Sequence, residues 1–169
     1  MMEKTCCVTG HKDIPVRQME AVKADLRREI GKAVADGYTG FMTGFINGVE
    51  QCFAEIVAEM KKEHPKLRLI AVLPYQKRLD TLQAGKRTKA LLNACSEIIV
   101  IQENYEPSVY ARRNRYIVNQ SDRVIAVYDG REKGGTVKVI RLAHMMRKEL
   151  REIPVEGIVL PRRPITRKK

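Results

Sequence analysis

The stretch RVIAVYDGREKGGTVKVIRLA, residues 123–143, joins a short run rich in Val and Ile to a charged loop, two glycines and a second apolar repeat. The first run, residues 123–130, has the length and the β-branched content of a buried strand. In the second, Ile140 and Ala143 stand at helical spacing. A strand that passes through a glycine turn into a helix is the repeating unit of parallel α/β sheets, so this stretch predicts that architecture.

The rest of the chain repeats the same unit. Short apolar runs alternate with segments whose apolar residues recur every three or four positions. The expected strands lie at residues 4–10, 39–44, 67–74, 97–101, 123–130 and 157–161, and the expected helices at residues 16–35, 49–60, 78–93 with a break at Gly85, 108–120 and 136–151. This order predicts a Rossmann-like three-layer α/β sandwich with a mostly parallel sheet of five to six strands.

Three of the helical segments show a clear apolar stripe. The stripes are formed by Val16, Met19, Val22, Leu26, Ile30 and Ala33 in the first helix, by Val49, Cys52, Phe53, Ile56, Val57 and Met60 in the second, and by Ile140, Ala143 and Leu150 in the last. A stripe of this kind covers one face of a sheet, so we expect these side chains in the core.

Length and composition suit one globular domain, which we assign to residues 1–160 of the 169. Residues 161–169, PRRPITRKK, carry five positive charges and no acid, and they predict a mobile basic tail. No apolar run approaches the roughly 20 residues of a membrane helix. Because the first residues also lack a signal-peptide pattern, we expect a cytoplasmic protein without a membrane partner.

The four cysteines, Cys6, Cys7, Cys52 and Cys95, show no C-x-x-C spacing. Buried, reduced thiols are therefore expected, with Cys6 and Cys7 on opposite faces of one strand. No histidine has partners at metal-ligand spacing, so we expect no metal site.

The net charge of +12 and the basic tail offer a hypothesis of weak nucleic-acid binding. The alternative is a solvated terminus, because most other basic residues are interspersed with acids. Aromatic residues make up only 5% of the chain and there is no Trp, so an obvious stacking platform for single strands is missing. A homo-oligomer stays open.

Most of the expected strands end in glycine, hydroxyl or amide groups. In open parallel sheets, ligands bind outside the carboxyl ends of the strands, where helix N-termini converge on anions. Two glycine turns on that edge suit a phosphate or diphosphate, although each turn alone is also the ordinary exit of a strand. Neither G-x-G-x-x-G at the first turn nor a P-loop motif occurs, which argues against an ordinary dinucleotide dehydrogenase or P-loop NTPase.

Five short segments carry a resemblance to a known family: VTGHK at 8–12, TGFINGVEQ at 43–51, VLPY at 72–75, RRNRYIVNQSDRVIAVYDG at 112–130 and KGGT at 133–136. They resemble the YpsA-like branch of the SLOG superfamily, which also contains the DprA DNA-processing proteins and the LOG phosphoribohydrolases. The resemblance implies a pocket for a nucleotide or nucleotide derivative, such as NAD or an ADP-ribose-like molecule, at the first, second and last glycine turns.

The sequence departs from the family pattern at four positions that bear on this pocket. Lys12 replaces an arginine, Glu50 an aspartate, and Phe45 a glycine, whose replacement by a large ring is expected to narrow or reshape the pocket. Val139 falls where LOG enzymes have a glutamate, and a valine cannot move a proton. Hydrolysis by that mechanism is disfavoured unless Glu50 or Asp129 substitutes, so catalysis stays open.

We therefore expect a nucleotide-binding domain that acts in sensing or processing. The alternatives are a nucleotide hydrolase of the phosphoribohydrolase type and a DprA-like nucleic-acid-binding protein. Helix capping by Glu50, a basic helical face at Arg113 and rim packing of the tyrosines are the competing structural explanations. The candidate ligand-binding residues are Thr9, Gly10, His11, Lys12, Thr43, Gly44, Asn47, Gly48, Glu50, Pro74, Tyr75, Arg113, Asn114, Tyr128, Asp129, Gly134, Gly135 and Thr136.

Overall fold

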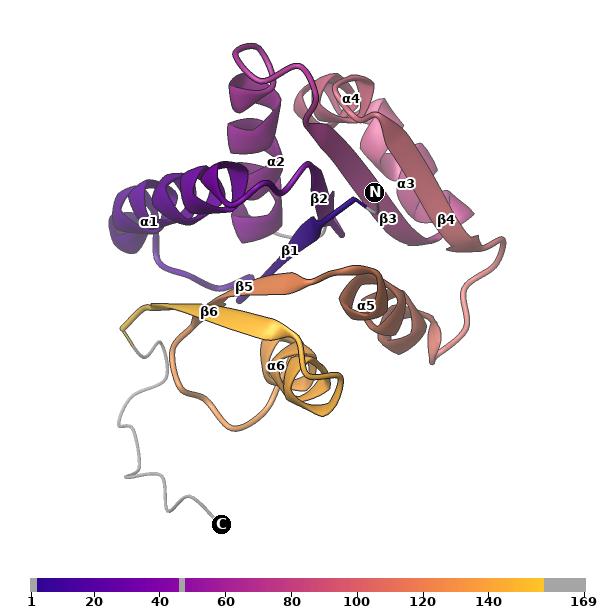
Figure 1. The fold of residues 1–169 in the computed structure, drawn as a ribbon. Coiled ribbons are helices and arrows are strands. Elements are labelled where there is room, and N and C mark those ends of the chain that lie inside the picture. The colour runs from indigo at the N-terminus through magenta and orange to yellow at the C-terminus, as the bar shows by residue number, and fades with distance from the viewer. Residues whose placement is uncertain (1–2, 46–47, 157–169) are drawn as a thin grey trace.

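The computed structural model describes residues 3–45 and 48–156 (Figure 1). Strands and helices alternate along this part of the chain, and no described helix is long and apolar enough to cross a membrane. The elements are β1 (Thr5–Gly10), α1 (Val16–Ala35), β2 (Gly40–Thr43), α2 (Gly48–Met60), β3 (Arg68–Tyr75), α3 (Gln76–Ala84), α4 (Lys86–Asn93), β4 (Glu97–Gln102), α5 (Val109–Gln120), β5 (Arg123–Tyr128), α6 (Gly135–Met145) and β6 (Glu149–Pro154).

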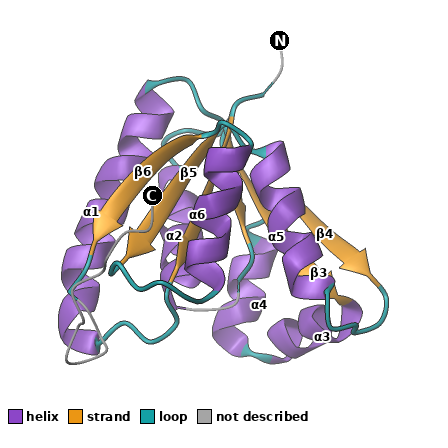
Figure 2. Cartoon of the chain, turned by 90° about the horizontal axis from the view of Figure 1, so that it is seen from below, coloured by secondary structure: helices purple, strands orange, loops and turns teal. Residues whose placement is uncertain are grey.

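The strands form one six-stranded sheet in the order β4-β3-β2-β1-β5-β6, and every neighbouring pair is parallel. The predicted Rossmann-like α/β sandwich is thus confirmed. From β1 the chain moves outward to β4, then returns past β1 and adds β5 on the other side. The strand order reverses at β1, and Figure 2 shows the strands ending at a common edge. This reversal is the place where such sheets bind ligands.

Helices cover both faces of the sheet, with α1 and α2 on one side and α5 and α6 on the other (Figure 1). Side chains alternate along β1, so Cys6 joins the core under α1 and α2 while Cys7 joins the core under α5 and α6. Cys52 is buried, Cys95 is half-buried, and all four thiols are free. Burial raises the pKa of Cys7 to about 12, so this thiol is a core side chain without thiolate character.

The predicted helices agree closely with the observed ones, including the break at Gly85 between α3 and α4. The stripe of α2 is buried as expected except for Met60, which is half-buried, and in α1 the buried apolar residues are Val22, Leu26, Ile30 and Ala33. Val16 was wrongly included, since 87% of its surface is exposed at the first turn of the helix.

The end of the last predicted helix is wrong. Instead of continuing to residue 151, α6 stops at Met145, and Arg147 takes a left-handed φ of 55°. The Lys148 N–H then donates to the Ala143 carbonyl at 2.8 Å, which closes the helix by a Schellman-type turn. Leu150 therefore lies in β6, paired with Val124 of β5. The strand expected at 157–161 and the tail at 161–169 lie outside the described residues.

Candidate functional site

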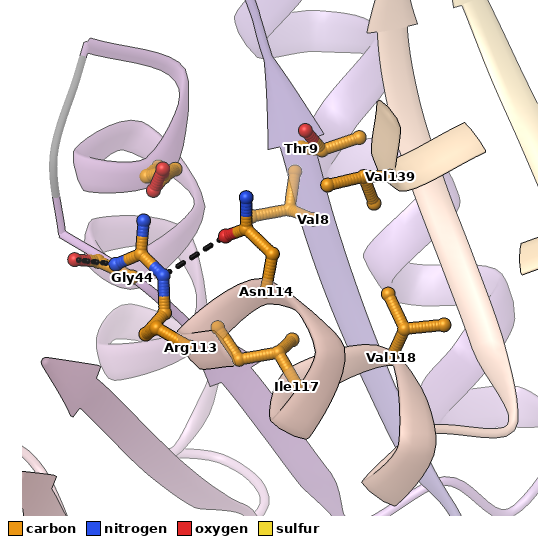
Figure 3. Close-up of a pocket in the computed structure, with 9 residues that line it drawn as sticks. Val8, Thr9, Gly44, Arg113, Asn114, Ile117, Val118 and Val139 are labelled. Atoms are coloured by element: carbon orange, nitrogen blue, oxygen red, sulfur yellow. Dashed lines mark hydrogen bonds between the residues drawn. The ribbon is translucent and has the colours of Figure 1, made fainter. Parts of the chain in front are cut away.

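A pocket lies at the point where the strand order reverses, between the ends of β1 and β2 and the helices α2, α5 and α6 (Figure 3). Its walls come from both helical layers, because α2 covers one face of the sheet and α5 and α6 cover the other. It is lined by Val8, Thr9, Gly44, Glu50, Arg113, Asn114, Ile117, Val118 and Val139. Five of these residues, Thr9, Gly44, Glu50, Arg113 and Asn114, were candidates from the sequence.

Arg113 dominates the pocket. Its side chain is only 3% exposed and turns from α5 across the strand ends, so it does not belong to a solvated basic face. One guanidinium nitrogen, Nη1, donates to the carbonyl oxygens of Gly44 at 3.1 Å and Val72 at 3.3 Å. Its Nε donates to the amide oxygen of Asn114 at 2.9 Å. Burial lowers the pKa of Arg113, and the nearby Glu50 carboxylate opposes that shift, so a buried cation and a buried anion share the pocket.

The glycine at position 44 is required by this arginine. A methyl group placed on Gly44 would lie 2.3 Å from Arg113 Nη1 and 3.0 Å from Glu50 Oε2. From the sequence pattern, we expect the glycine at position 44 to let a ligand approach the backbone. In the structure, the group next to this backbone is the Arg113 guanidinium.

Phe45 does not narrow the pocket. It adopts the left-handed φ of 59° that a glycine takes easily, and its ring is completely buried in the core shared with Val49 and Phe53. The ring is absent from the pocket lining. The backbone shape typical of glycine is therefore kept, while the side chain is used for packing.

The pocket is small as it stands, with about 20 Å³ open to the centre of a water-sized molecule. That space holds roughly one water, which needs about 10–15 Å³. A larger ligand has to lie along the strand ends and reach into the pocket with one group.

A second polar cluster lies at the ends of β1 and β5. His11 Nε2 is 3.1 Å from Asp129 Oδ1 and 3.2 Å from the Asp129 backbone nitrogen. Arg131 also binds the Asp129 carboxylate, with Nη2 donating to Oδ2 at 2.8 Å and Nε donating to Oδ1 at 3.0 Å. Its Nη2 also donates to Asp13 Oδ1 at 3.1 Å. Tyr128 belongs to the same cluster, with its ring 5.8 Å from that of His11.

The directions of the pKa shifts indicate the charge states of His11 and Asp129. Burial lowers the pKa of His11, although the Asp129 carboxylate raises it in part. For Asp129, burial raises the pKa, but hydrogen bonds from the Arg131 side chain and backbone outweigh that effect and hold it well below its usual range. At neutral pH a neutral imidazole thus accepts the Asp129 N–H beside an ionised Asp129–Arg131 pair. Arg131 and Asp13 were not identified from the sequence as members of this cluster, because nothing in their spacing along the chain indicates that they contact each other.

The glycine turns differ in what occupies the space beside them. A methyl group on Gly10 would meet Val49 at 2.6 Å, so this glycine allows β1 to pack against α2. Gly134 has a φ of 123° and precedes the first turn of α6, which begins at Gly135. A methyl group on Gly135 would meet nothing within 4 Å. Gly134 and Gly135 are both exposed, so the start of α6 lies at the surface.

The remaining candidates are scattered. Thr43 is fully buried, and its hydroxyl donates to the Glu50 carbonyl at 3.3 Å within its own loop. Pro74 and Thr136 are buried, whereas Lys12 and Gly48 are exposed. Asn47 lies outside the described residues.

Tyr75 belongs to a third group, in which its ring meets Tyr105 and Tyr110 at centroid distances of 5.5 and 6.2 Å. Sequence patterns did not reveal this group, since its members come from three separate segments. Within residues 3–45 and 48–156, no set of three or more His, Cys, Asp and Glu side chains could hold a metal ion.

Comparison with known proteins places this arrangement in a family. The model of the YspA SLOG family (YpsA) matches residues 6–160. The UPF0398 protein of Ligilactobacillus salivarius (strain UCC118) is 27% identical over 140 residues, which cover 76% of each chain.

Two solved structures share the fold. DNA processing protein A from Helicobacter pylori has a TM-score of 0.65 at 22% identity, over 90% of this chain and 66% of that one. The Moco carrier protein of Chlamydomonas rheinhardtii has a TM-score of 0.53 at 16% identity, over 90% and 77%. Because the family model matches nearly the whole chain, the resemblance carried by the five sequence segments is confirmed, and the chain belongs to the YspA SLOG family.

Proposed function

We propose that this protein binds a nucleotide or nucleotide derivative along the carboxyl edge of its sheet. The observation that carries the proposal is the buried Arg113, fixed over the strand ends beside Glu50 and Asn114 at the reversal of strand order. A buried cation and carboxylate with a polar amide are costly to hold in a core, and such groups are typical of a binding site.

In this proposal the ligand phosphates lie at the start of α6. Gly134 and Gly135 are exposed at the start of that helix, where the helix dipole and the first backbone N–H groups favour an anion. The exposed Lys12 of the neighbouring β1 turn adds positive charge. Glu50 and Asn114 are suited to hydrogen bonds with a ribose hydroxyl and a base edge.

Binding, rather than hydrolysis of a ribose–base bond, is the activity proposed. The buried Val139 lines the pocket from α6, at the position where the phosphoribohydrolases that this chain resembles carry their glutamate. Glu50 is the carboxylate among the lining residues, and it shares the pocket with Arg113.

Nucleic-acid binding is the second candidate. The helices α4, α5 and α6 contain no acidic residue, whereas each carries Lys or Arg. The Helicobacter protein with the same fold is described as binding single-stranded DNA. If three cations of this chain contact phosphates, the slope of log affinity against log salt for a single strand is about −2. A slope near zero would remove this candidate.

The proposed function is tested by thermal unfolding of two variants that differ only in charge. Gly135→Asp places a carboxylate where the phosphate would lie, and Gly135→Asn places a neutral group of the same size there. Both should fold, because the space is open and an acid in the first turn of a helix is favourable. The probes are ADP-ribose, NAD and adenosine mono- and triphosphates.

A ligand at 100 times its Kd adds about 2.7 kcal/mol to the unfolding free energy. For a domain of this size that corresponds to a rise in Tm of about 5–10 °C. We expect this rise in the wild type and in Gly135→Asn, and its loss in Gly135→Asp. No rise with any probe at millimolar concentration, or an equal rise in both variants, would contradict the assignment.

A further inference from the structure

Three tyrosines form an aromatic cluster at the carboxyl ends of β3 and β4. Tyr75 is the last residue of β3, Tyr105 lies in the loop after β4, and Tyr110 is in the first turn of α5. Tyr75 meets both of its neighbours edge to face, at interplanar angles of 77° and 88°. The three rings thus hold one another in a fixed arrangement, although they come from three segments of the chain.

The cluster is open to solvent at its outer side. Tyr105 is 58% exposed, although its ring packs against that of Tyr75, and Tyr75 and Tyr110 are half-buried. Arg78 and Arg113 are two cations close enough to Tyr110 to act on the pKa of its hydroxyl. Sites that bind single-stranded nucleic acids stack the bases on exposed aromatic side chains of this kind, with cations nearby.

Arg113 connects this surface to the pocket. Its guanidinium carbon lies 5.6 Å from the centre of the Tyr110 ring, while its Nη1 binds the carbonyl of Gly44 in the pocket wall. The polar pocket and the tyrosines are therefore neighbours along one edge of the sheet. Tyr105 follows β4 and α6 follows β5, and these two strands are four positions apart in the sheet. At about 4.8 Å per strand, the tyrosines and the start of α6 are about 19 Å apart.

We propose that the tyrosine cluster is a base-stacking subsite, so that the ligand of this edge contains a nucleobase at a distance from the phosphate held at α6. This inference rests on the proposed function. A span of about 19 Å suits two linked nucleotide units better than one mononucleotide. Both a dinucleotide and a short single strand carry a base and a phosphate at such a distance, so either could supply the stacked base.

Tyrosine fluorescence gives a direct readout, because the chain has six tyrosines and no tryptophan. The probes are AMP, NAD and thymidine oligonucleotides of two and four nucleotides, titrated at low and high salt. The variants are Tyr105→Ala, which removes the exposed ring, and Tyr105→Phe, which keeps it. Tyr116→Phe is the matched control, since Tyr116 is a half-buried α5 tyrosine that packs against the core on the other side of the helix.

We expect the two-unit probes to quench the fluorescence of the wild type, and Tyr105→Ala to weaken their binding by about 5- to 150-fold. Tyr105→Phe and the control should bind as the wild type does, and AMP should be insensitive to all three. If NAD binds, the ligand is a dinucleotide. If the oligonucleotides bind and their affinity falls steeply with salt, the ligand is a single strand.

Equal binding of the two-unit probes by the wild type and Tyr105→Ala would overturn the subsite and leave the proposed function intact. Binding that is sensitive to Tyr105→Ala but not to Gly135→Asp would uphold the subsite and overturn the placement of the phosphate. If no probe binds to the wild type, both proposals fail.

Discussion

At the scale of single residues, Gly44 and Arg113 depend on each other, because the guanidinium fills the space that any side chain at position 44 would need. We predict that Gly44→Ala lowers the free energy of unfolding by about 1–3 kcal/mol, the usual cost of forcing an extra methyl group into a packed site. Urea denaturation measures this. Gly135→Ala is the control, since a methyl group there meets nothing and should change stability by no more than about 0.5 kcal/mol.

The same substitution should also weaken ligand binding, because the displaced guanidinium can no longer hold its place over the strand ends. An unchanged unfolding curve for Gly44→Ala would mean that Arg113 moves aside at no cost, and its fixed position would cease to support the site.

Phe45 combines a strained backbone with a buried ring, and the two effects oppose each other in Phe45→Gly. Loss of a buried Phe side chain costs about 3–5 kcal/mol, while relief of the left-handed φ returns about 1–2 kcal/mol. We predict a net loss of about 1–4 kcal/mol in the free energy of unfolding, measured in urea. Stability equal to that of the wild type would show that the ring contributes little to the core, contrary to its complete burial.

His11 gives the protein a defined sensitivity to acid. Burial lowers the pKa of its imidazole in the folded state, so below about pH 6.5 the unfolded chain takes up a proton that the folded chain does not. The unfolding free energy should therefore fall as the pH drops from 7 to 5. A further fall is expected below about pH 4, where the unfolded chain protonates Asp129 and the folded chain, with its lowered pKa, does not.

The variant His11→Gln should lose the first of these two falls and keep the second. His144→Gln, at an exposed position of α6, is the control and should follow the wild type. Denaturant titrations at half-unit steps of pH measure the profile, and a wild-type slope between pH 7 and 5 in His11→Gln would assign the proton to another group.

At the scale of the elements, α6 ends at a non-glycine residue in a left-handed conformation. Arg147 has a φ of 55° and an exposed side chain, so Arg147→Gly removes the backbone strain without removing a core contact. We predict a gain of about 0.5–1 kcal/mol in the free energy of unfolding, since part of the relief is offset by the entropy of glycine in the unfolded chain. Thermal unfolding checks the sign.

Lys138→Gly, at an exposed position inside α6, is the control with the opposite expectation, a loss of about 1 kcal/mol. Destabilisation by Arg147→Gly would mean that the arginine side chain has a role that its exposure does not reveal.

The same turn explains where sequence patterns fall short for the fold. Apolar periodicity identified five strands and the helices, because burial on a parallel sheet leaves a strong signal. The strand β6 was missed, since it lies at the sheet edge, carries charged residues such as Glu149 and Arg151, and follows a turn without the usual glycine.

The site was predictable to a similar extent. Glycine turns and topology predicted a pocket at the first, second and last glycine turns. The pocket in the structure is lined from the ends of β1 and β2, and none of Gly134, Gly135 and Thr136 lines it. The inward direction of Arg113 and the meeting of Tyr75 with Tyr105 and Tyr110 were not predictable, because they depend on contacts between segments separated by dozens of residues.

At the scale of the whole molecule, charge is unevenly distributed over the fold. The acid-free helices α5 and α6 lie together on one face, while α2, on the other face, has three glutamates and no Lys or Arg. That second face is mixed, because α1 carries five Lys or Arg beside three acids and α4 carries three Lys or Arg and no acid. The pocket lies where these layers meet, at the carboxyl edge. The net charge of +12 favours the approach of an anionic ligand without selecting one side of that edge.

A nuclear magnetic resonance titration of the ¹⁵N-labelled protein with the nucleotide that gives the largest rise in Tm tests whether the ligand binds at the carboxyl edge. We expect amide shifts to concentrate at that edge, at Thr9, Gly44, Asn114 and Gly135, and the amides at the amino ends of the strands to stay unmoved. Shifts confined to residues away from that edge, or none at saturating ligand, would contradict this expectation.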